Sequence, residues 1–182
     1  VMYSGNHAFV HPLGTLLNAI KLLKEDPRFL FVFVGGGVRK KDVTEFNINH
    51  KLKNIIQLPF QPRENIHNSL GSSDIQVVIM GDNQVGFTHP NKIYGAMYVG
   101  KPILYIGPRQ SHVTDILSEL ESNITVDHNE SELLVEKLLD FASLNSIERE
   151  KIGKANFEFV NSNFSAEVLK RNMLDALLIK DE

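Results

Sequence analysis

The chain alternates short apolar segments with longer amphipathic ones, and this alternation constrains the fold more than any other feature. The apolar segments are rich in β-branched and aromatic residues, as expected of strands buried on both faces, and lie at Val1–Ser4, Phe29–Val34, Asn54–Leu58, Ile75–Met80, Pro102–Ile106 and Ile124–Val126. Segments with helical spacing of apolar residues separate and follow them, at Pro12–Asp26, Lys40–His50, Arg63–Leu70, Pro90–Val99, Ser111–Leu120, Ser131–Ser143, Ser146–Asn161 and Ser165–Ile179. The pattern predicts an α/β, Rossmann-like doubly wound parallel sheet of about six strands, in the order 3-2-1-4-5-6, with helices on both faces.

Composition limits the class of protein. The 182 residues fit one domain, residues 1–182, and Val1 already lies in the first predicted strand, so we expect a domain of a longer protein. A net charge of −3 without a basic run makes nucleic acid an unexpected partner. The absence of cysteine excludes disulfides and thiolate zinc sites. No apolar stretch reaches the ~18 residues of a membrane-spanning helix and no signal-peptide pattern is present, so the cytoplasm is the expected compartment.

Ligands of doubly wound sheets bind in the crevice beyond the carboxyl ends of the strands. The loops predicted at that edge are Gly5–His11, Gly35–Lys41, Pro59–Arg63, Gly81–His89 and Gly107–His112. Candidate binding residues are therefore sought in these loops and in the helix starts that follow them.

The loop before the fourth predicted helix ends in Pro90, a residue favoured at the first helical position. This predicts His89 or Thr88 as the N-cap and places Lys92 in the first turn, where the helix dipole disfavours a cation. A lysine at that position indicates either a bound anion in front of the helix or a side chain that extends into solvent. Spacing alone leaves both interpretations open.

Three glycines, Gly35–Gly37, end the second predicted strand and precede the basic residues Arg39–Lys41. Glycines let backbone N–H groups approach a phosphate closely, and arginine can bind phosphate through two hydrogen bonds. The segment lacks the Walker and Gly-x-Gly-x-x-Gly patterns. It is either a phosphate-binding turn or a tight turn beside a solvated basic cluster.

Three histidines, His7, His11 and His89, fall in loops at the same sheet edge. Imidazole is a common metal ligand, but no carboxylate or thiolate stands at a ligand spacing near them. We therefore expect polar roles near an anion, and no metal.

The segment Pro90–Leu104 reads Pro-Asn-Lys-Ile-Tyr-Gly-Ala-Met-Tyr-Val-Gly-Lys-Pro-Ile-Leu. It resembles the nucleotide-sugar motif of group 1, or family 4-like, glycosyltransferases with the GT-B architecture, in particular their bacterial polysaccharide-biosynthesis branch. Further segments resemble the same branch in the same order, namely Tyr3–His7, His11–Ala19, Phe31–Gly37 and Leu58–Glu64. The resemblance covers about residues 2–107 with specific motifs.

The resemblance implies the C-terminal, donor-binding half of a GT-B enzyme, which binds a UDP- or GDP-sugar without a metal or other cofactor. In this interpretation the base lies on the loop of Phe60, while Lys92, Arg39 and Lys40 stabilise the diphosphate. The residues that the resemblance assigns to donor binding are Gly5, Asn6, His7, Gly35, Gly36, Gly37, Arg39, Lys40, Phe60, Gln61, Pro62, Thr88, His89, Pro90, Asn91, Lys92, Ile93 and Gly95.

The chain departs from the family at several positions. The two glutamates of most group 1 enzymes correspond to Phe87 and Gly95, and the usual arginine and lysine of the first loop correspond to Asn6 and His11. The ribose must therefore be recognised without the usual carboxylate.

The expected reaction is transfer of a sugar from the nucleotide to an acceptor hydroxyl, with retention of configuration, in capsule, lipopolysaccharide or other glycoconjugate synthesis. The resemblance also implies a separate N-terminal acceptor domain, so this chain alone would bind the donor without turnover, and peripheral association of the full-length protein with the inner face of the membrane. The last helix, Ser165–Ile179, is expected to project from the domain or to expose an apolar patch. The alternatives are a degenerate nucleotide-binding or regulatory module and a GT-B-like nucleotide-sugar epimerase.

Overall fold

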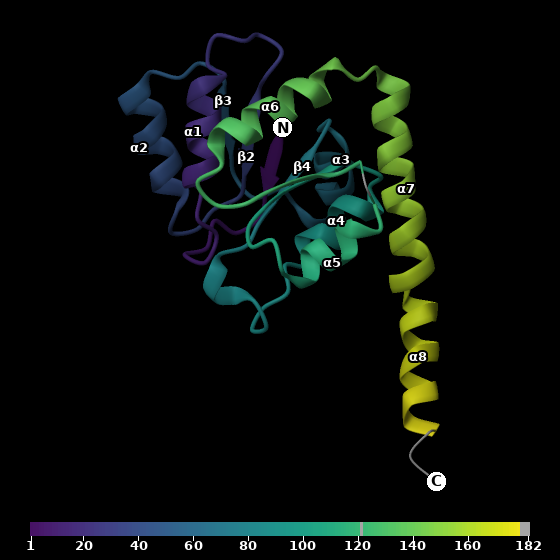
Figure 1. Cartoon of the computed structure of the whole chain (residues 1–182). Helices are drawn as coiled ribbons and strands as arrows, with labels where there is room; N and C mark the ends of the chain where they lie inside the picture. Colours follow the sequence, from purple (N-terminus) through teal and green to yellow (C-terminus); the bar gives the residue numbers. More distant parts are fainter. Residues whose placement is uncertain (121, 179–182) are drawn as a thin grey trace.

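The computed structural model describes residues 1–120 and 122–178, in which six parallel strands form one sheet (Figure 1). The strands are β1 (Met2–Ser4), β2 (Phe31–Val34), β3 (Ile55–Leu58), β4 (Gln76–Ile79), β5 (Ile103–Ile106) and β6 (Ile124–Val126). Their order is β3-β2-β1-β4-β5-β6, which confirms the predicted topology. The strand order reverses beside β1, which pairs with β2 on one side and β4 on the other.

Side chains alternate between the two faces of the sheet, and each face has its own core. On β4, Val77 and Ile79 pack with α1 (Gly14–Leu22), α2 (Lys40–His50) and α6 (Ser131–Ser143). Val78 faces the opposite way and packs with α4 (Lys92–Tyr98), α5 (His112–Ser118) and α7 (Ser146–Phe164). All four residues of β4 and of β5 are buried, as expected of central strands covered on both sides.

Several predicted helix bounds need correction. The first helix begins at Gly14 rather than Pro12, and it ends at Leu22 rather than Asp26. Tighter turns follow Leu22, and Pro27 disfavours a helical conformation of the residue that precedes it. The segment at Arg63 forms a 3₁₀ turn, η1 (Arg63–Asn65), before α3 (Ile66–Gly71), and an unpredicted 3₁₀ turn, η2 (Asp82–Gln84), follows β4. The seventh helix continues to Phe164, beyond the predicted end.

The predicted start of α4 is wrong. The helix begins at Lys92 with Asn91 as its N-cap, and not at Pro90 with His89 or Thr88 as the cap. The Thr88 hydroxyl donates to Gln84 Oε1 (3.1 Å) and so does not cap the helix. Pro90 instead precedes the first turn, where its carbonyl accepts from the Ile93 amide (3.1 Å). Lys92 is still in the first turn, as predicted.

The last helix, α8 (Ala166–Leu178), continues from the end of α7 and extends away from the sheet (Figure 1). Its apolar side chains Leu169, Met173, Leu174 and Leu177 are exposed. The expected projecting helix is thus confirmed, while the predicted end at Ile179 lies outside the described residues. In the part of the chain that the structure describes, no helix has the length and apolar character to cross a membrane.

Helix α7 packs closely on the turn after α4, and this contact provides a test of the fold. A Cβ on Gly153 would lie 2.7 Å from the Gly100 carbonyl carbon and closer still to its oxygen. We expect Gly153→Ala to lower the free energy of unfolding by about 1–3 kcal/mol, the usual cost of overpacking. Urea unfolding measures it, with Gly14→Ala as the control, since a Cβ at Gly14 meets nothing within 4 Å. Equal stability of the two variants would contradict this packing.

Candidate functional site

A cavity of about 290 Å³ lies between the sheet and helices α3 and α4, and we call it the crevice. Its walls are formed by residues of β4, of the ends of β1 and β2, of the loop after β3 and of the two helices. They are Ser4, Gly5, Val34, Phe60, Gln61, Ile66, Ser69, Leu70, Gln76, Val77, Val78, Lys92 and Gly95. The crevice therefore brings together segments that are far apart in the sequence, at the strand-order reversal.

Lys92 reaches across the crevice from the start of α4 to β1. Its Nζ donates to the Tyr3 hydroxyl (2.7 Å) and to the Asn6 carbonyl oxygen (3.3 Å), and it lies 3.9 Å from the centre of the Tyr3 ring. Gly5 makes room for this side chain, because a Cβ there would lie 2.9 Å from Lys92 Cε. Among the described residues, Lys92 has only neutral hydrogen-bond partners and no carboxylate partner.

This environment changes the protonation of several side chains. Burial lowers the pKa of Lys92 to about 7 and raises the pKa of the Tyr3 phenol well above its usual range. Burial, and then the nearby charge of Lys92, lowers the pKa of both His7 and His11. An anion beside Lys92 would favour its charged form, because opposite charges raise the pKa of an ammonium group.

The glycines of the loops after β1 and β2 lie against one another. Gly5, Gly35 and Gly37 all have φ between +121° and +127°, a region that favours glycine. A Cβ on Gly35 would strike the Gly5 carbonyl, and one on Gly37 would strike Asn6 and the His7 backbone. The predicted Gly35–Gly37 turn is therefore required for the two loops to pack closely.

The Phe60 ring covers these glycines from the loop after β3. Its atoms lie 3.2 Å and 3.0 Å from the positions that a Cβ would take on Gly35 and Gly36. Phe60 is 61% exposed, so part of its side chain is accessible to a ligand at the edge of the crevice. Gln61 lines the crevice beside it, whereas Pro62 precedes the 3₁₀ turn at Arg63.

The two other predicted phosphate-binding cations are engaged elsewhere. Arg39 Nε donates to the Phe9 carbonyl (2.9 Å), and its guanidinium pairs with Asp42 (3.0 Å). Lys40 Nζ donates to the carbonyls of Gly35 (2.7 Å) and Leu58 (3.1 Å), so it joins the ends of β2 and β3. Both side chains hold loops in place in the structure as it stands, and Lys92 is the cation that lines the crevice.

The remaining predicted residues of the α4 region differ in placement. Gly95 lines the crevice one helical turn after Lys92, and a Cβ there would meet Leu70 at an ordinary 3.7 Å. The Ile93 side chain is buried in the core with Val78, so only its backbone could contact a ligand. His89 packs against Tyr94 and His112, with ring centres 5.2 Å and 5.8 Å away.

The three histidines do not form one group. His7 is fully buried and its Nδ1 donates to the Gly36 carbonyl (3.2 Å), while His11 Nδ1 lies 3.0 Å from the Tyr3 hydroxyl. His89 instead contacts Tyr94 of α4 and His112 of α5. Within residues 1–120 and 122–178, the His, Cys, Asp and Glu side chains form no group of three or more arranged to hold a metal ion.

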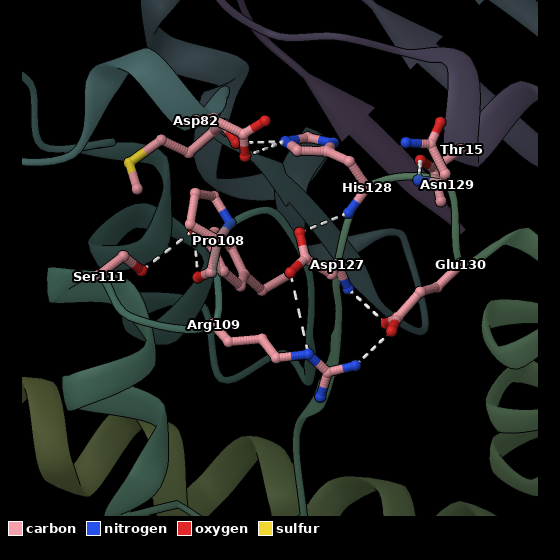
Figure 2. A network of polar contacts seen from close by, with 11 residues as sticks. Thr15, Asp82, Pro108, Arg109, Ser111, Asp127, His128, Asn129 and Glu130 are labelled. Carbon is pink, nitrogen blue, oxygen red and sulfur yellow. Dashed lines mark hydrogen bonds and ion pairs between the residues drawn. The ribbon is translucent and has the colours of Figure 1, made fainter.

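A second polar network joins the loops after β4, β5 and β6 (Figure 2). His128 Nε2 lies 2.9 Å from the Met80 carbonyl and 3.7 Å from Asp82 Oδ1. Arg109 pairs with Asp127 and Glu130, and the Asn129 amide donates to Thr15 Oγ1 (2.8 Å). This network was not predicted, and it fixes the loops on the β6 side of the crevice.

Tyr3 is the main site residue that our interpretation of the sequence did not assign. It is 1% exposed on β1, yet its hydroxyl is satisfied by Lys92, Asn6 and His11. A tyrosine in a strand buried on both faces needs a hydrogen-bond partner for its hydroxyl. That requirement is the signal in the sequence that points to Tyr3.

The fold and the position of the crevice are those of a doubly wound α/β protein with a ligand site at the strand-order reversal. The sequence profile described as "Glycosyl transferases group 1" matches residues 1–159. The chain therefore belongs to the group 1 glycosyltransferase family.

A curated relative and several solved structures are similar to this chain. The probable glycosyltransferase WbjE of Pseudomonas aeruginosa is 21% identical over 164 residues, which are 87% of this chain and 41% of WbjE. A glycosyltransferase from Rickettsia africae matches all of this chain and 48% of its own, with a TM-score of 0.79 and 20% identity. Anabaena HepE in complex with UDP-glucose matches 97% of this chain and 47% of its own, with a TM-score of 0.76 and 14% identity. The chain thus spans less than half the length of each of these proteins.

The burial of Lys92 makes folding stability depend on pH. Its pKa is about 7 in the folded chain and near 10.4 when unfolded, so between these values the unfolded state binds more protons. Stability from this group must therefore rise with pH across that window, by at most about 1.4 kcal/mol per pH unit. We expect the free energy of unfolding of the wild type, relative to Lys92→Met, to increase between pH 7 and 9.5 in urea titrations without ligand. Parallel pH curves for the two proteins would show that Lys92 titrates normally.

Proposed function

We propose that the crevice binds the nucleoside diphosphate part of a nucleotide-sugar donor, with a UDP-sugar as the first candidate and a GDP-sugar as the second. The observation that carries this proposal is the Lys92 ammonium, which lies in a cavity at the strand-order reversal with neutral partners. Burying a cation without a counter-charge is costly, and an anionic ligand would supply that charge. The complexes of HepE with UDP-glucose and of TarM of S. aureus with UDP support the choice of uridine.

The walls of the crevice suggest how the donor lies. The exposed Phe60 side chain and the amide of Gln61 suit a flat base, which can stack on one and hydrogen bond to the other. The diphosphate then lies beside Lys92 and Gly5. The ribose lies between the base and the diphosphate, next to Gly95. Glycine at this position leaves the middle of the crevice open.

The chemistry that follows is glycosyl transfer. As the bond between the sugar and the diphosphate breaks, negative charge develops on the leaving group. A fixed ammonium in a partly buried site stabilises that charge better than water does. We infer transfer to an acceptor hydroxyl with retention, in polysaccharide or glycoconjugate synthesis, with the acceptor and the general base held by a part of the protein outside these residues.

The first test removes the cation. We expect Lys92→Ala to weaken UDP binding by about 1–3 kcal/mol, the range for a hydrogen bond to a charged group, as measured by isothermal titration calorimetry. Lys53→Ala is the matched control, because Lys53 is an exposed lysine just before β3, at the opposite end of the sheet. Unchanged UDP affinity of the Lys92 variant would contradict the proposed function, as would an equal loss in the control.

A second test fills the crevice. Gly95→Leu should abolish binding of both UDP and uridine, because its side chain would extend from α4 into the cavity where the ribose is proposed to lie. The variant should keep its fold, since glycine inside a helix is disfavoured by about 0.5–1 kcal/mol relative to alanine. Circular dichroism and thermal melting check the fold, with Gly71→Ala as the control at an open helix position. If Gly95→Leu still binds uridine, the ribose does not lie beside Gly95 and the proposed placement is wrong.

One alternative rests on a specific observation. Phe87 is 86% exposed and Gly95 has no side chain, so the two positions at which most of the family has glutamate carry no charge. A degenerate binding or regulatory module would bind UDP without transferring sugar. An assay of the full-length protein with UDP-sugars and an acceptor separates the two, because the module predicts binding without a glycosylated product. An epimerase would instead form a new sugar without any acceptor.

A further inference from the structure

The Tyr3 hydroxyl is an unusual feature of the central strand. Tyr3 is 1% exposed and its ring packs against His7 and Phe33, where a phenylalanine would fill the same space. A buried hydroxyl is costly unless it is hydrogen bonded. The hydrogen-bond partners of the Tyr3 hydroxyl should therefore explain why a tyrosine occupies this position.

The hydroxyl links three groups at the crevice. It lies 2.7 Å from Lys92 Nζ, 3.0 Å from the Asn6 carbonyl oxygen and 3.0 Å from His11 Nδ1. Because an ammonium only donates, the hydroxyl accepts from Lys92 and turns its own proton to Asn6 or His11. The face of the same ring lies 3.9 Å from Nζ, a cation–π contact.

These contacts fix the direction of a long, flexible side chain. Lysine otherwise carries about 2 kcal/mol of rotamer entropy, and the start of α4 would favour an ammonium that points away from the helix. The Tyr3 hydroxyl and the Asn6 carbonyl instead hold Nζ over the β1 end of the crevice. A carboxylate partner would also bind the ammonium, but its negative charge would neutralise that of the lysine.

We propose that Tyr3 is a positioning residue, which holds the Lys92 ammonium in the crevice through a neutral oxygen and so leaves its charge available to the diphosphate of the ligand. This inference rests on the proposed function. The titratable groups near Nζ agree with it, since Tyr3, His7 and His11, from β1 and the loop after it, carry no negative charge. The α3 residues that line the crevice, Ile66, Ser69 and Leu70, are uncharged.

Tyr3→Phe tests the proposal because it removes one oxygen and keeps the ring. We expect its UDP affinity to fall about 3- to 10-fold, as for the loss of one hydrogen bond, while uridine affinity stays the same. Affinity of the wild type for UDP should decrease from pH 6.5 to pH 8.5 as Lys92 loses its proton, and this pH profile should shift in the variant. Tyr98→Phe, at an exposed tyrosine of the same helix as Lys92, is the control.

A double-mutant cycle separates positioning from a structural role. If Tyr3 acts through Lys92, then Tyr3→Phe should have no further effect on UDP affinity in the Lys92→Met background. An equal loss in both backgrounds, a loss of uridine and UDP affinity together, or an unshifted pH profile would overturn the inference. The proposed function fails separately, if the wild type binds neither UDP nor GDP, and the inference fails with it.

Discussion

The parallel pairing of β1 with β2 on one side and β4 on the other is the constraint on which the rest of the structure depends. The connections carry the chain away from β1 in one direction through β2 and β3, and in the other through β4, β5 and β6. The crevice lies beside this reversal, between the sheet and helices α3 and α4. The start of α4 can reach β1 only because of this reversal.

The fold brings the Lys92 ammonium into the crevice beside neutral partners and without a carboxylate. The cores on the two faces of the sheet hold β1 and α4 rigidly, so the lysine and Tyr3 meet at a fixed distance. Gly5, which must be glycine both for its φ of +121° and for the contact with Lys92, completes the site. Natural proteins rarely bury a lysine unpaired, and the proposed diphosphate would supply the missing counter-charge.

Much of the fold could be predicted because the strands are continuous apolar runs and their alternation with helices admits few topologies. The strand order followed from this pattern, whereas the glycine turn and the first-turn position of Lys92 were inferred from Gly35–Gly37 and from Pro90. The predicted start of α4 was wrong, because the Thr88 hydroxyl bonds to Gln84 and does not cap the helix. The spacing of residues in the sequence does not show which of these two local hydrogen bonds forms. The contacts of Arg39 with the Phe9 carbonyl and of Lys40 with the Leu58 carbonyl could not be predicted, because every residue has a backbone carbonyl.

The most direct measurement is a crystal structure of this protein with UDP. The account predicts diphosphate oxygens within hydrogen-bonding distance of Lys92 Nζ, with the ribose beside Gly95 and the uracil on Phe60. Lys92 should keep its contact with Tyr3 in that complex. UDP bound outside the crevice, with Lys92 distant from every phosphate oxygen, would contradict the central claim.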